Sequence, residues 1–284
     1  MSLTLKNENG YTYAEEGHGA VVILLHGLMG GPENFAPVIP GLRHVCHVVI
    51  PCLPLFELPL RKANVKELVH FLRGFIAYKG YGSVILAGNS LGGHVALLYA
   101  LKHPEGVRAM VLTGSSGLTE NTMGTTIPRR KDYDYVREKA ALTFYDPAVA
   151  TKELVDSVFA VLNDNIQALR LLRMAKSAVR ENLGHDLYRL SMPVGLIWGR
   201  DDIVTPPEVA EEFHQKLPLS RLSYLDHCGH APMMEKPEEF SVLFRRYLRW
   251  FDQVREDAYE AVAVNAPGLS RLQADEKTTL PAWA

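Results

Sequence analysis

The sequence has few cysteines, no excess of charge and no long apolar run. Its three cysteines, in 284 residues and without CxxC spacing, do not form a disulfide framework, so we expect a reducing compartment. Lys and Arg number 30 and Asp and Glu 32, a net charge of −2, which gives no electrostatic case for nucleic-acid binding. No apolar run approaches the roughly 20 residues that span a bilayer, and no secretory signal begins the chain. We therefore expect a cytoplasmic protein without a membrane span.

What the sequence does contain is a regular alternation of strand-like and helix-like segments. Short apolar runs rich in β-branched residues are typical of strands buried on both faces of a parallel sheet. Strands are expected in a hairpin within 3–14 and at Val21–Leu25, Val45–Ile50, Val84–Ala87, Val107–Leu112, Val194–Trp198 and Leu222–Leu225. Helices are expected near 62–79, 91–103, 207–217 and 237–252 from apolar residues at three- and four-residue spacing.

The alternation is interrupted once, between residues 117 and 190. No strand-like run occurs there, and several amphipathic helical segments follow a polar stretch. We predict a helical cap at 117–190, inserted between two parts of one core at 1–116 and 191–258. The periodicity fades after Trp250, so residues 259–284 are predicted to form a tail.

A candidate nucleophile lies where the predicted strand Val84–Ala87 runs into the helix predicted near 91–103. The segment Gly88-Asn89-Ser90-Leu91-Gly92 is a GxSxG motif in that strand–turn–helix setting. Glycines two positions either side of the serine permit a turn so tight that the serine hydroxyl is exposed. The helix that follows has free N–H groups at its start, which stabilise negative charge beside Ser90.

A serine hydroxyl needs a base and an acid that orients the base. His230 follows the last predicted strand, and two candidate acids, Asp201 and Asp202, follow the strand before it. The chain order serine, acid, histidine is the order found in α/β-hydrolases.

The chain resembles the α/β-hydrolase fold over about residues 10–255. Four motifs carry the resemblance: His26–Gly30, Gly88–Gly92, Trp198–Pro206 and Gly229–Pro232. The resemblance implies an eight-stranded, mostly parallel sheet flanked by helices, with a helical cap. It also implies that Asp202 is the acid, being the third residue after Gly199, and that the backbone N–H groups of Leu28 and Leu91 form the oxyanion hole. His26 is then a structural residue of its loop.

The reaction class follows from the same motifs. The Gly88–Gly93 segment is similar to that of meta-cleavage product hydrolases, whereas His26–Gly30 with Asn34 is closer to small carboxylesterases and thioesterases. A serine at position 90 disfavours the epoxide hydrolases and haloalkane dehalogenases, whose nucleophile is aspartate. We predict hydrolysis of a carboxylic ester or thioester, with C–C bond hydrolysis or a slow-turnover receptor on this fold as alternatives.

No metal-ligand spacing and no nucleotide-binding fingerprint occurs, so neither a cofactor nor a metal ion is expected. The expected partner is a small acyl substrate, and the sequence is compatible with a homo-oligomer.

Several other segments have two interpretations. The apolar loop 51–59, which contains Phe56, either lines a substrate pocket or packs between the sheet and the cap. The basic run Arg129-Arg130-Lys131 either attracts an anionic substrate or forms a solvated charged surface. His94 is expected to pack on its helix, and His227 and Cys228 are expected to shape the loop before His230.

Overall fold

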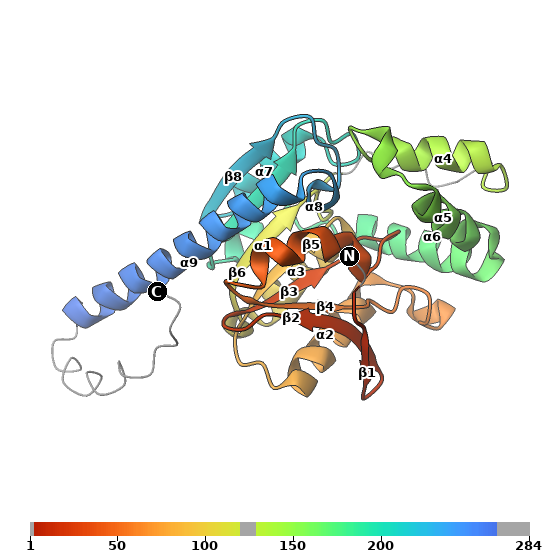
Figure 1. Ribbon diagram of the computed structural model, residues 1–284. Helices are drawn as coiled ribbons and strands as arrows, with labels where there is room; N and C mark the ends of the chain where they lie inside the picture. The colour runs from red at the N-terminus through yellow and green to blue at the C-terminus, as the bar shows by residue number, and fades with distance from the viewer. Residues whose placement is uncertain (1–2, 120–128, 266–284) are drawn as a thin grey trace.

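The computed structural model describes the backbone of residues 3–119 and 129–265 and the side chains up to residue 257 (Figure 1). Within these residues eight strands form one sheet in the order β1-β2-β4-β3-β5-β6-β7-β8. The strands are β1 Lys6–Glu8, β2 Tyr11–Glu16, β3 Val21–Leu25, β4 His47–Pro51, β5 Val84–Asn89, β6 Val107–Thr113, β7 Val194–Gly199 and β8 Ser220–Leu225. Only the β1–β2 and β2–β4 pairs are antiparallel. The predicted eight-stranded, mostly parallel sheet is therefore confirmed.

The predicted N-terminal hairpin is formed by β1 and β2. Its two turn residues, Asn9 and Gly10, have φ values of 50° and 79°. Positive φ at both central positions is typical of the tight hairpin turn whose twist matches that of the strands. This hairpin adds the antiparallel edge to the parallel sheet.

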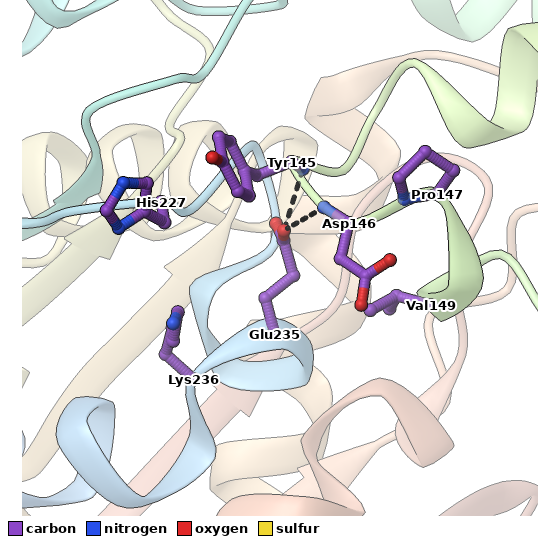
Figure 2. Close-up of a pocket in the computed structure, with 7 residues that line it drawn as sticks. All are labelled: Tyr145, Asp146, Pro147, Val149, His227, Glu235 and Lys236. Atoms are coloured by element: carbon purple, nitrogen blue, oxygen red, sulfur yellow. Dashed lines mark hydrogen bonds between the residues drawn. The ribbon is translucent and has the colours of Figure 1, made fainter.

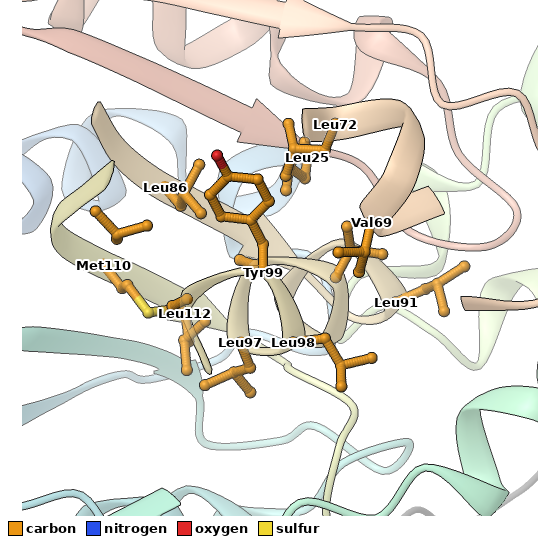
Figure 3. Packing of buried hydrophobic residues seen from close by; sticks show 14 of the residues in the cluster. Leu25, Val69, Leu72, Leu86, Leu91, Leu97, Leu98, Tyr99, Met110 and Leu112 are labelled. Atoms are coloured by element: carbon orange, nitrogen blue, oxygen red, sulfur yellow. The ribbon is translucent and has the colours of Figure 1, made fainter. Parts of the chain in front are cut away.

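Helices cover both faces of the sheet. One face carries α2 Val65–Lys79, α3 Leu91–Lys102 and α7 Pro207–Lys216, and the other carries α1 Ile39–Leu42 and α9 Pro237–Asn265. Every residue of α3 from Leu91 to Ala100 is buried, and Figure 3 shows its leucines and Tyr99 packed against side chains of the sheet and of α2. A helix buried on all sides holds its N-terminus in a fixed place, and Ser90 lies directly before it.

Three α-helices occupy the described part of 117–190. They are α4 Tyr133–Ala141, α5 Lys152–Asn163 and α6 Asn165–Arg180, and no strand occurs among the described residues of this segment. Each begins at a side chain that accepts a backbone N–H, namely Asp132, Thr151 and Asp164. The helix α6 is attached to the core, because Ser177 Oγ accepts the N–H of Val65 at 3.1 Å. Residues 120–128 of the predicted cap lie outside the described residues.

The helix predicted near 237–252 is longer in the structure. The helix α9 continues to Asn265, so residues 259–265 are helical, while 266–284 lie outside the described residues. The chain has no proline or glycine between Pro237 and Pro267. A helix can therefore continue there, because no residue of this stretch breaks it.

The sequence analysis did not predict the short helices. They include α1 and α8 Pro232–Glu235, and the 3₁₀ segments Pro32–Val38, Leu60–Lys62, Pro104–Gly106, Pro147–Val149 and Leu187–Arg189. Most begin at or next to a proline, and one turn is too short to show a period. All three cysteines are free thiols. Among the described helices, none has both the length and the apolar character that crossing a membrane requires.

Candidate active site

Ser90 lies in a strained turn between β5 and α3. Its φ is 54° and its ψ is −122°, an unusual backbone for a residue with a side chain. The flanking glycines leave no room for larger residues: a Cβ at Gly88 would lie 2.4 Å from the carbonyl carbon of Gly92, and one at Gly92 would lie 2.0 Å from Leu25 O. Only glycine fits at positions 88 and 92, as the GxSxG motif predicts.

Backbone hydrogen bonds fix this turn to the next strand. The N–H of Ser90 donates to Thr113 O at 3.2 Å, and Ser90 O accepts the N–H of Ser116 at 3.1 Å. The serine is only partly buried. Its backbone is therefore held while its side chain remains reachable.

The structure brings His230 and Asp202 together. His230 Nδ1 lies 2.9 Å from Asp202 Oδ2, and both side chains are buried. Asp202 also accepts the N–H groups of Val204 at 2.8 Å and Thr205 at 2.9 Å, and the Thr205 hydroxyl at 2.8 Å. A carboxylate surrounded by donors accepts a hydrogen bond from the Nδ1–H of the imidazole as well. The Nε2 atom of His230 is then left without a proton and able to accept one.

Asp201, the other candidate acid, is placed differently. It is exposed, and its Oδ2 accepts the N–H of Cys228 at 3.3 Å. Asp201 thus supports the loop before His230, whereas its neighbour Asp202 contacts the imidazole itself.

Two residues that the sequence analysis did not single out connect His230 to the serine turn. Asn89 donates from Nδ2 to His230 O at 2.9 Å and to Thr113 O at 3.1 Å. Gly114 has a φ of +50°, and a Cβ there would lie 2.8 Å from His230 Nδ1. A glycine is needed at 114 for both reasons. The only sequence signal for Asn89 is its position beside Ser90.

The two residues expected to supply the oxyanion hole belong to segments that lie next to the serine. Leu91 is the first residue of α3, where helix geometry leaves the N–H without an intrahelical acceptor. Leu28 follows Gly27, at which a Cβ would lie 3.3 Å from Ser90 Cβ. The loop that carries Leu28 therefore lies against the serine turn.

His26 holds this loop. Its Nε2 accepts the N–H of Leu53 at 3.0 Å, and its Nδ1 lies 3.0 Å from Gly27 O. Burial lowers the pKa of His26 to about 4, so the ring is neutral at pH 7. These contacts fit the structural role that the resemblance implies.

An apolar cluster links the loops beside Ser90 to the three helices of the inserted segment. Val136, Leu162 and Leu171, which come from α4, α5 and α6, pack together with Leu28 and Phe56. Phe56 also packs against the main core. The loop 51–59 thus lies between the sheet and these helices, a position compatible with both of its interpretations.

The remaining candidates engage in local contacts. His94 is buried, its Nε2 donates to Glu181 O at 2.9 Å, and burial lowers its pKa to about 4. The ring of His227 lies 5.1 Å from that of Tyr145. Burial raises the pKa of the Cys228 thiol, which keeps it protonated and unreactive.

Within the basic run, Arg129 is paired with Asp132, and Arg130 donates to Leu162 O at 2.7 Å. Two of its three cations thus make local contacts, Arg129 at the start of α4 and Arg130 at the end of α5. In the described part of the chain, no group of three or more His, Cys, Asp or Glu side chains is placed to hold a metal ion.

Comparison with known proteins gives one consistent family. The sequence pattern of the alpha/beta hydrolase family matches residues 22–242. The chain is 32% identical over 247 residues to a 2-hydroxy-6-oxo-6-(2'-aminophenyl)hexa-2,4-dienoic acid hydrolase of Metapseudomonas resinovorans, covering 81% of this chain and 84% of that one. It is 27% identical over 267 residues to Lipase 1 of Psychrobacter immobilis, covering 84% and 80%.

Solved structures show the same fold. One is an alpha/beta hydrolase enzyme from the metagenome of sediments from the lagoon of Mar Chica, Morocco, which is 41% identical with a TM-score of 0.72. The match covers 88% of this chain and 99% of that one.

Proposed function

We propose that this chain, which belongs to the alpha/beta hydrolase family, hydrolyses a carboxylic ester or thioester through an acyl-enzyme on Ser90. The observation that carries the proposal is the buried 2.9 Å contact between His230 and Asp202, tied through Asn89 to the turn that holds Ser90. A nucleophile, a base and an orienting acid are the parts that acyl transfer needs.

In the proposed mechanism His230 Nε2 accepts the proton of Ser90 as the hydroxyl attacks the substrate carbonyl. Asp202 holds the Nδ1 proton and stabilises the imidazolium that forms. The N–H groups of Leu28 and Leu91 stabilise the oxyanion, and loss of one such donor typically costs about 2.7–4 kcal/mol. His230 then gives its proton to the leaving group and activates the water that releases the acid.

We further propose that the helices of 117–190 act as a cap over this site and make its wall apolar. Support comes from Leu28, a proposed oxyanion residue that packs against a cluster drawn from α4, α5 and α6. Phe56 joins the same cluster from the 51–59 loop. An apolar wall favours an acyl or alcohol group with little charge, and discriminates chain lengths by roughly 1–3 kcal/mol per methylene.

Hydrolysis of a C–C bond is the second candidate. A relative that is 32% identical is named for a dienoic acid hydrolase, and such a reaction uses the same three side chains. Esters therefore need to be compared with a dienol meta-cleavage product.

The experiment is turnover of p-nitrophenyl esters from acetate to palmitate, and of such a dienol acid, by wild type and by the Ser90→Ala variant. Ester turnover that disappears with Ser90 supports the proposal. Rapid loss of the dienol chromophore with no ester turnover favours the C–C hydrolase. Ligand binding with no turnover of either class favours a receptor.

A further inference from the structure

The carboxylate of Glu235 collects backbone donors from two segments that are far apart in the sequence. Glu235 ends α8, five residues after His230. Its Oε1 accepts the N–H of Gly229 at 2.8 Å. Figure 2 shows its other two hydrogen bonds, in which Oε2 accepts the N–H groups of Tyr145 at 2.7 Å and Asp146 at 3.4 Å. One side chain thus joins the loop of His230 to the chain that follows α4.

A second contact joins the same two segments without Glu235. The N–H of His230 itself donates to Thr143 O at 2.8 Å. The approach is close, because a Cβ at Gly229 would lie 2.7 Å from Thr143 O and 2.9 Å from Phe144 Cα. Residues 143–146, which we call the strap, therefore lie directly against the backbone of the imidazole-bearing residue.

The ionised carboxylate suits this place. Both of its oxygens face N–H donors, and a protonated carboxyl group would aim an O–H at one of them. Burial raises the pKa of Glu235, while the backbone donors act in the opposite direction. Glu235 is half-buried, and the cost of partly desolvating its charge is offset by hydrogen bonds that hold two segments together.

We propose that Glu235 is a positioning residue for His230. By tying the strap to the His230 loop, its carboxylate fixes the imidazole relative to Asp202 and Ser90. This inference rests on the proposed function. It also makes the geometry of the catalytic base depend on the segment that follows α4, so that the inserted helices contribute to catalysis as well as to substrate binding.

The test is the Glu235→Gln variant. The amide keeps the size of the side chain but replaces one oxygen with an NH₂ group, which opposes a backbone donor and releases one side of the clamp. We expect kcat for a p-nitrophenyl ester to fall about 10- to 100-fold, with KM within about twofold of wild type. The matched control is Glu239→Gln, which makes the same charge change at an exposed position on the first turn of α9 and leaves both constants unchanged.

A readout independent of activity is amide hydrogen exchange. The N–H groups of Gly229 and Tyr145 donate to Glu235 in the wild type, so at least one of them exchanges faster in Glu235→Gln. This measurement separates the two proposals. If the wild type hydrolyses no ester, the proposed function fails, and exchange still decides whether the clamp exists.

A double variant separates positioning from a general loss of structure. If Glu235 acts through His230, Glu235→Gln lowers kcat by less than about threefold in an Asp202→Asn background, where the imidazole is already misoriented. An equal loss in both backgrounds overturns the inference. So does an unchanged kcat in the single variant, or unchanged exchange at Gly229 and Tyr145.

Discussion

His230 Nδ1 and Asp202 Oδ2 lie 2.9 Å apart in a buried pair. Asp201, the residue before Asp202, instead accepts the N–H of Cys228 in the loop before His230. Of these two adjacent carboxylates, one contacts the imidazole and the other supports the loop that carries it. Asp202 receives three further donors from Val204 and Thr205, which fix it as an acceptor for the imidazole.

The Asp202→Asn variant is expected to lose activity on the order of 10⁴-fold in kcat. The amide donates to Nδ1, so the imidazole keeps its proton on Nε2, where it cannot take the proton of Ser90. Asp201→Asn, made beside it, keeps an acceptor for Cys228 and stays within about threefold of wild type. Steady-state kinetics with one ester measures both variants, and equal losses would contradict the assignment of the acid.

Gly114→Ala is expected to lower kcat by about tenfold or more, because its Cβ would lie 2.8 Å from His230 Nδ1 and displace the ring. Gly80→Ala is the control. Gly80 also has a positive φ, +66°, but nothing lies within 4 Å of a Cβ there. Both variants bear a backbone strain of about 1–2 kcal/mol in unfolding free energy, yet only the first should slow turnover. Full activity in Gly114→Ala would show that a Cβ at position 114 does not displace the His230 ring.

Phe56→Ala is expected to shift the preferred acyl or alcohol chain by a few carbons, with a change of roughly 1–3 kcal/mol per methylene in relative kcat/KM. The reason is that Phe56 packs with Leu28 and the cluster from α4, α5 and α6. Relative kcat/KM across the p-nitrophenyl series measures the shift. A uniform change for every chain length would show that the 51–59 loop only packs between the sheet and the helices.

Acid should destabilise the fold through two buried histidines whose pKa burial lowers. His26 and His94 each have a folded-state pKa of about 4, below the ordinary value for histidine. Stability is therefore complete above the unfolded pKa of about 6.5 and is lost as pH falls toward 4, because only the unfolded chain takes up the proton. From pH 7 to pH 5 the unfolding free energy should fall by about 2 kcal/mol for each histidine.

Urea unfolding of wild type and His94→Gln at the two pH values checks this expectation. The variant should lose about 2 kcal/mol less than wild type between pH 7 and pH 5. His18→Gln, at an exposed position, should follow the wild type. The same loss in all three proteins would mean that His94 takes no part in acid unfolding.

The sheet could be predicted because its central parallel strands are buried on both faces and are therefore nearly continuous apolar runs, as in Val21–Leu25. Ser90 could be found because the turn that presents it admits only glycine at 88 and 92. Strand burial and a tight turn both restrict which residues can occupy particular positions, so both can be recognised in the sequence. The end of α9 could not be placed from the sequence, because no proline or glycine marks it before Pro267.

The contacts that assemble the site could not be predicted. Asn89 and His230 are 141 positions apart, and Tyr145 and Glu235 are 90 apart. Their pairing depends on how the sheet and the inserted helices are arranged in space. Patterns of neighbouring residues do not predict how the sheet and these helices are placed relative to each other.

Hydrolysis of the p-nitrophenyl ester series by wild type and Ser90→Ala, at equal folded concentration, decides whether this chain is a serine-dependent esterase. We expect turnover by the wild type with an optimum in chain length, and a loss on the order of 10⁶-fold in the variant. Equal turnover by both proteins, or no turnover of any ester by a folded wild type, would contradict this expectation.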